Sequence, residues 1–179
     1  MRYPLVLHPD VHRSAVTDIV VEASRTAGRL ALSYEIAGDL AALRLPAPAA
    51  PERADELWKT TCLEAFVKPV GGEAYVELNL YPSARWAAYA FDAYRDGMRN
   101  AGAIGDPGIV TRMRKGSLVL EAAADLSGLP PGPLRLGLSA VIEDIAGNKA
   151  YWALAHPPGK ADFHHADCFA AEIPPTGGA

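Results

Sequence analysis

A short central stretch of the chain carries side chains that together could hold a molecule rich in hydroxyl groups. It contains two carboxylates, Glu64 and Glu77, the amide Asn79 and the guanidinium of Arg85. Carboxylates accept hydrogen bonds, a guanidinium donates them through a rigid fork and an amide does both, so the set suits the vicinal hydroxyls of a sugar. The alternative is a solvated sheet face on which the same charges form surface ion pairs.

A tryptophan next to this stretch could add an aromatic platform. Tryptophan more often packs in a core, because its large area dominates packing. Trp58, however, precedes an expected strand and is followed by a charged residue, where a fully buried indole is less expected. An indole beside hydrogen-bonding carboxylates suits a pyranose ring, one face of which presents apolar C–H groups.

Hydrophobic alternation predicts that residues 60–67 and 75–81 form two strands of a hairpin, joined by a turn rich in proline and glycine. One apolar set would face a core, which leaves Glu64 and Glu77 together on the opposite face. A turn centred near Val70 and Gly71 would set Glu64 almost opposite Glu77. Because like charges in that position destabilise a sheet, the arrangement needs a compensating partner.

The elements that must position these residues are short strands. Apolar residues alternate with period two along much of the chain, and proline and glycine clusters separate the runs. This pattern predicts an all-β fold, an antiparallel, jelly-roll-like β-sandwich of about ten strands. One or two short helices are expected, around residues 51–58 and 93–99.

Residues 1–173 are expected to form a single domain and residues 174–179 a flexible C-terminal tail. The Ala/Pro stretch at residues 45–51 is interpreted as an ordered crossover loop within the domain. No internal repeat is evident.

Composition limits the classes of partner. The chain has 17 Lys and Arg residues against 21 Asp and Glu residues, a net charge of −4, and no basic stripe, so neither a nucleic acid nor a membrane is expected as a partner. Its two cysteines, Cys62 and Cys168, form no metal or redox motif and are expected to be buried and reduced. With no signal-peptide core, a cytoplasmic location is expected. Oligomeric state leaves no signature in one sequence.

Four runs of the sequence resemble one family. They read LWKTTCLEAFVKP, YVELNLYPSARWAAYAF, SAVIEDIAGNKAYWALAHP and DFHHADCFAAEI. In these runs the chain is similar to the DOMON-like proteins, relatives of the family 9 carbohydrate-binding modules and of the haem- and sugar-binding DOMON domains. The resemblance covers nearly the whole chain and implies a β-sandwich that binds its ligand on one face and the adjoining loops.

The resemblance also implies roles for individual residues. In the family 9 modules two tryptophans sandwich a sugar, and a glutamate, an arginine and an asparagine hydrogen-bond to it. The matching residues here are Trp58, Glu64, Arg85, Asn148 and Trp152. The resemblance therefore predicts a non-catalytic domain with a small-molecule, saccharide ligand and no cofactor.

Three other functions are open. Some DOMON domains bind haem, and His164 and His165 could contribute to a haem or metal site, although neighbouring residues of a strand point to opposite faces. Glu64 and Glu77, if about 5 Å apart, would fit a retaining glycosidase. A scaffold that contacts other proteins through strand edges and aromatic residues is the third.

Overall fold

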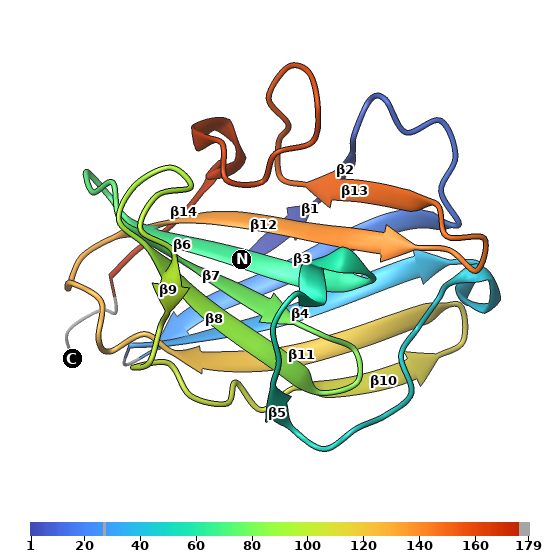
Figure 1. Ribbon diagram of the computed structural model, residues 1–179, viewed down its shortest axis with the longest axis horizontal. Coiled ribbons are helices and arrows are strands. Elements are labelled where there is room, and N and C mark those ends of the chain that lie inside the picture. Colours follow the sequence, from blue (N-terminus) through green and yellow to red (C-terminus); the bar gives the residue numbers. More distant parts are fainter. Residues whose placement is uncertain (27, 176–179) are drawn as a thin grey trace.

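Two largely antiparallel β-sheets face each other in the computed structural model, which describes residues 1–26 and 28–175 (Figure 1). The smaller sheet has the order β1 (Arg2–Pro4), β3 (Val16–Thr26), β4 (Arg29–Gly38), β11 (Ser117–Asp125), β10 (Val110–Arg114). The larger sheet has the order β2 (Val6–Leu7), β13 (Lys149–Ala153), β12 (Leu134–Glu143), β6 (Cys62–Pro69), β7 (Tyr75–Leu80), β8 (Arg85–Phe91), β5 (Glu52–Arg53). Two further strands join the larger sheet: β14 (Ala171–Ile173) pairs with β12, and β9 (Arg99–Asn100) pairs with β8.

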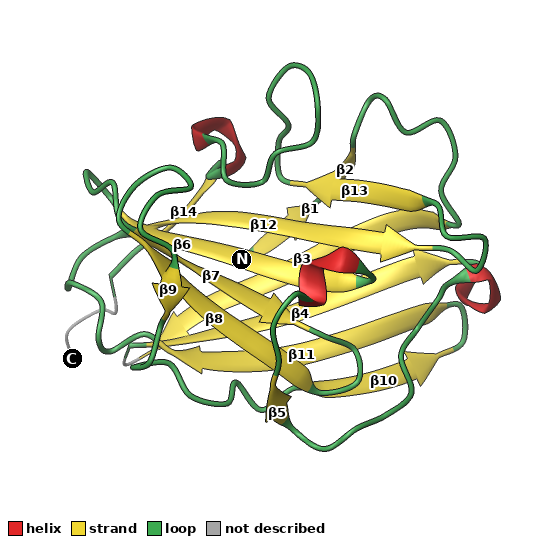
Figure 2. Cartoon of the chain, viewed as in Figure 1, coloured by secondary structure: helices red, strands yellow, loops and turns green. Residues whose placement is uncertain are grey.

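The predicted all-β sandwich is confirmed (Figure 2). The structure has more strands than the expected ten or so, because several edge strands of two or three residues are too short to show a period. Alternate residues of both sheets interdigitate in one apolar core, which contains Ile19, Tyr34, Leu78 and Leu138. The hydroxyl of Tyr34 crosses this core and donates a hydrogen bond to the backbone carbonyl of Glu64 at 2.7 Å.

Helical structure among the described residues consists of three single 3₁₀ turns: η1 (Leu40–Ala42), η2 (Leu57–Lys59) and η3 (Ala166–Cys168). The helix expected at 51–58 is instead β5 and the start of η2, since Glu56 adopts a left-handed φ of 62°. The helix expected at 93–99 is a turn leading into β9, where Arg95 and Gly97 have φ values of 54° and 67°. Left-handed residues interrupt a right-handed helix.

The predicted hairpin of β6 and β7 is present, but its register differs from the expected one by two residues. Glu64 is paired with Asn79, and Glu77 with Phe66. The turn is centred one residue later than expected, and Gly71 supplies its left-handed φ of 80°. A shift of two leaves every side chain on its predicted face, whereas a shift of one would have inverted the strand.

No helix in the described part of the chain has the length and apolar character needed to cross a bilayer. Residues 176–179 of the expected tail lie outside the described residues.

Candidate functional site

The outer face of the larger sheet carries a second apolar cluster, separate from the core between the sheets. Its buried residues are Leu57, Cys62, Phe66, Tyr75, Ala87, Tyr89, Phe91, Val141, Ala153, Phe163 and Phe169. The alternation of β6 and β7 therefore separates two buried faces. The solvated polar face that was the alternative interpretation of Glu64 and Glu77 is not what the fold provides.

Two loops supply the cover over this face. Residues 154–170, between β13 and β14, contribute Phe163, His164 and Phe169, and residues 92–98, between β8 and β9, contribute Arg95. The loops are tied together at Asp162, which accepts a hydrogen bond from Arg95 Nη2 at 2.7 Å and another from the Tyr94 hydroxyl. The walls of the site are thus fixed to each other as well as to the sheet.

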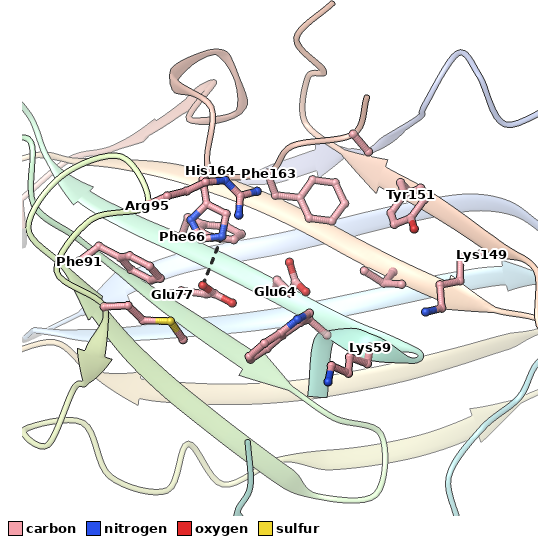
Figure 3. Close-up of a pocket in the computed structure, with 14 residues that line it drawn as sticks. Lys59, Glu64, Phe66, Glu77, Phe91, Arg95, Lys149, Tyr151, Phe163 and His164 are labelled. Carbon is pink, nitrogen blue, oxygen red and sulfur yellow. Dashed lines mark ion pairs between the residues drawn. The ribbon is translucent and has the colours of Figure 1, made fainter. Parts of the chain in front are cut away.

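A pocket of about 450 Å³ lies between the sheet and these loops (Figure 3). Its lining combines aromatic side chains, two carboxyl groups and several cations: Trp58, Lys59, Glu64, Phe66, Glu77, Phe91, Arg95, Met98, Val141, Lys149, Tyr151, Ala161, Phe163 and His164.

The floor of the pocket is recessed at Glu64, because the cross-strand neighbours of Glu64 have small side chains. Ser139 of β12 and Asn79 of β7 flank Glu64, and Ala153 and Ala87 lie beyond them in the same row. The adjacent rows carry bulky pocket-lining residues, including Tyr151 on one side and Phe66 on the other. Small side chains between large ones leave a hollow above the carboxyl group.

Glu64 is the more buried of the two carboxyl groups, with 2% of its surface exposed. Its Oε2 accepts a long hydrogen bond of 3.4 Å from Ser139 Oγ. Burial and then the negative charge of Glu77 raise the pKa of Glu64 well above its ordinary value.

Glu77 is held from two sides. Asn79 Nδ2 donates to its Oε1 at 2.8 Å, and His164 Nε2 lies 3.7 Å from its Oε2. Burial raises the pKa of Glu77 to about 6, with the hydrogen bond from Asn79 acting against this shift. Burial lowers the pKa of His164 to about 4, so the imidazole is neutral at pH 7, and its Nδ1 is 2.7 Å from the Tyr75 hydroxyl.

Comparison with solved structures bears on what such a site is used for. A proposed carbohydrate-binding protein from Bacteroides uniformis ATCC 8492 superposes with a TM-score of 0.71 at 14% identity, over 97% of this chain and 85% of that one. A family 9 carbohydrate-binding module from Caldicellulosiruptor kristjanssonii, solved with glucose and with cellotriose, superposes with a TM-score of 0.54 at 11% identity. These matches cover 93% of this chain and 80% and 78% of those chains.

The chain has the fold of carbohydrate-binding modules. At these identities the likeness extends to the fold alone. No protein-family model matches the chain, and no curated protein matches it.

Of the residues singled out from the sequence, Trp58, Glu64 and Glu77 lie together in the pocket. Trp58 is half-buried on η2, where its indole contacts Tyr89 edge to face at 5.7 Å between ring centroids. Asn79 is fully buried beside Glu64, does not line the pocket and orients Glu77 through its hydrogen bond.

The structure does not bring the other three, Arg85, Asn148 and Trp152, into this pocket. Arg85 starts β8 at the sheet edge, where it is partly exposed and pairs with Glu52 of β5 at 3.6 Å. Asn148 lies in the exposed turn before β13 and donates from Nδ2 to Asp144 Oδ2 at 2.9 Å. Trp152 is 5% exposed and packs in the core between the sheets.

Tyr151, the residue before Trp152, occupies the position in the pocket that was expected for Trp152. Tyr151 points to the outer face and lines the pocket, because successive residues of β13 alternate between faces. Alternation within β13 leaves open which of the two adjacent aromatic residues faces outward, and the pairing with β12 decides it. Phe163 and Arg95, in contrast, are on loops without a period, and no sequence signal identified them.

The two histidines also separate. His164 enters the pocket, whereas the partly exposed His165 caps η3, its Nδ1 accepting from the backbone N–H of Asp167 at 3.2 Å. Within the described ranges no group of three or more His, Cys, Asp or Glu side chains could hold a metal ion.

The raised pKa of Glu77 predicts a pH dependence of stability. Between about pH 4.5 and 6 the folded protein holds more protons on Glu77 than the unfolded chain does, so this residue lowers stability as the pH rises. His164 has the opposite effect, because the unfolded chain takes up a proton that the buried imidazole does not. We therefore expect Glu77→Gln, which removes the first effect, to gain stability with pH more steeply than the wild type, by on the order of 2 kcal/mol across this window.

Urea unfolding at a series of pH values measures this difference. Glu52→Gln, an exposed carboxylate on β5, is the control and should follow the wild-type profile. Parallel profiles for Glu77→Gln and the wild type would contradict the prediction.

Proposed function

We propose that the chain is a non-catalytic, DOMON-like saccharide-binding domain whose ligand occupies the pocket above Glu64 and Glu77. The observation that carries this proposal is a hollow in which aromatic rings surround two buried carboxyl groups. Pockets that combine apolar walls with a few fixed polar groups are the usual form of small-ligand sites. The shared fold of carbohydrate-binding modules supports the same proposal.

The chemistry of the lining suits a pyranose. Trp58, Tyr151 and Phe163 offer apolar ring surfaces on separate elements, against which the C–H faces of a sugar would pack. Glu64 and Glu77 would accept hydrogen bonds from ring hydroxyls, which a buried carboxyl group with few protein partners favours. Asn79, held against Glu77, would fix the direction in which that carboxyl group presents its free oxygen.

The glycosidase alternative depended on a cross-strand geometry that the register of β6 and β7 does not provide. The retaining-glycosidase alternative required Glu64 directly opposite Glu77, whereas Asn79 is opposite Glu64. We propose that the two carboxyl groups bind the ligand and do not react with it. No cofactor is proposed, since the volume above the floor suits a ring-sized ligand.

Isothermal titration calorimetry against a panel of mono- and disaccharides tests the proposal. We expect at least one saccharide to bind with a dissociation constant in the micromolar to millimolar range, a binding free energy of about −4 to −8 kcal/mol. Aryl glycosides added to the same samples should not be hydrolysed. A panel without heat would refute saccharide binding, and hydrolysis lost in Glu64→Gln would refute the non-catalytic role.

A further inference from the structure

The cations around the pocket are largely neutralised by acidic partners of their own. Lys59 Nζ lies 2.6 Å from Glu56 Oε1, and Arg95 Nη2 lies 2.7 Å from Asp162 Oδ1. Lys149 is exposed on β13, at the side of the pocket away from Glu77 (Figure 3). The positive charge at the mouth is therefore largely committed to the protein or to solvent.

The two carboxyl groups inside the pocket have no comparable compensation. Among the residues that the structure describes, Glu64 makes no ion pair, and the group within ion-pair distance of Glu77 is His164, whose imidazole is neutral. The guanidinium of Arg95 also attracts the charge of Glu77 and lowers its pKa, but Arg95 forms its ion pair with Asp162. Glu64 is 2% and Glu77 is 5% exposed, so water offsets little of their charge. A buried pair of like acids favours a bound positive charge.

The aromatic walls favour the same kind of ligand. Trp58, Phe66 and Phe91 line the pocket together with the two carboxyl groups. The faces of such rings attract cations, and the attraction grows when the cation is removed from water. A hollow that combines these rings with uncompensated acids binds a cation better than a neutral hydroxyl group.

We propose that the pocket selects a saccharide that carries a protonated amino group, with the ammonium bound between Glu64 and Glu77. This inference rests on the proposed saccharide-binding function and names the class of sugar. An ammonium donates three hydrogen bonds, which matches two carboxyl groups with free oxygen atoms. It also supplies the positive charge that the floor lacks.

Binding of this ligand has a consequence for protons. In the free protein, burial raises the pKa of both acids, and the charge of Glu77 raises the pKa of Glu64 further, so both retain protons that exposed carboxylates would lose. An ammonium that takes the place of such a retained proton as the compensating charge releases that proton to solvent. A neutral sugar donates hydroxyl hydrogen bonds and has no charge with which to displace it.

Calorimetry with matched sugars tests the inference. Glucosamine, glucose and N-acetylglucosamine share one ring and differ in the group on carbon 2, which is charged only in glucosamine. Galactosamine and mannosamine, each compared with its parent sugar, extend the series. At about pH 6.5, where the amine is protonated, we expect the amino sugar to bind about tenfold more tightly than its two neutral partners, about 1.4 kcal/mol. Repeating the titration in buffers of different ionisation enthalpy should reveal proton release with the amino sugar alone.

Two variants test whether the preference for the amino sugar arises from the carboxyl groups in the pocket. Glu77→Gln keeps the shape and removes one acid, and should reduce the preference to about twofold or less, whereas Glu52→Gln at the sheet edge should retain it. Circular dichroism confirms that each variant is folded.

The outcomes separate this inference from the proposed function. If glucose and N-acetylglucosamine bind as tightly as glucosamine, or if the preference survives Glu77→Gln, the amino-sugar inference is overturned and saccharide binding stands. If ethanolamine binds as tightly as glucosamine, the ring contributes nothing and saccharide recognition is overturned. If no sugar of either kind binds, both proposals fail.

Discussion

Replacement of Trp58 with alanine is expected to weaken saccharide binding by about tenfold or more, at least about 1.4 kcal/mol, while the protein stays folded. Trp58 is half-buried on the single turn η2, where it contacts Tyr89 and lines the pocket. Its removal takes away a large aromatic surface next to the carboxyl groups. The core between the sheets is untouched, so circular dichroism should be unchanged while calorimetry records the loss.

Arg85→Ala is the control for this experiment. The guanidinium lies at the sheet edge, pairs with Glu52 and does not line the pocket, so the affinity of Arg85→Ala should stay within about twofold of the wild type. Equal losses in Trp58→Ala and Arg85→Ala would restore the site expected from the sequence resemblance and contradict the pocket described above.

Trp152→Ala should have the largest effect on stability of any change considered. The indole is 5% exposed among the apolar residues between the two sheets, and its loss creates a cavity there. We expect the free energy of unfolding to fall by about 3–5 kcal/mol, measured by urea denaturation.

The neighbouring Tyr151→Ala is the matched comparison, since Tyr151 belongs to the same strand and faces the pocket. It should lower saccharide affinity more than Trp152→Phe does, and cost less stability than Trp152→Ala. If Trp152→Ala leaves stability within about 1 kcal/mol of the wild type, the assignment of Trp152 to the core is wrong.

Much of the fold and the two carboxyl groups of the site follow from the period of two. Alternation in β6 and β7 placed Glu64 and Glu77 on the same face, and that conclusion survived an error of two residues in the register. Proline and glycine residues indicate that a turn is present but do not fix its centre, which lies one residue later than expected, with Gly71 in a left-handed backbone conformation. Phase within a strand is robust to such a shift, but the identity of a cross-strand partner is not.

The remaining site residues could not be read from alternation for physical reasons. In β13 two aromatic residues are adjacent, and either Tyr151 or Trp152 could fill the core; only the packing against β12 decides between them. Arg95 and Phe163 come from loops, where side-chain direction depends on the path of the backbone and has no repeat. A solvated polar face also stayed open as the alternative, since nothing in a strand pattern reveals that a distant loop covers it.

The strands carry the two carboxyl groups of the pocket and the loops carry part of its walls, which affects how the pocket can change in evolution. The two carboxyl groups belong to the paired strands β6 and β7, where an insertion of one residue would move their side chains to the opposite face of the sheet. The segments above them, joined to each other at Asp162, can change length without disturbing that pairing. Proteins that evolve from this scaffold would therefore keep the two carboxyl groups of the sheet and acquire new ligand preferences through changes in the covering loops.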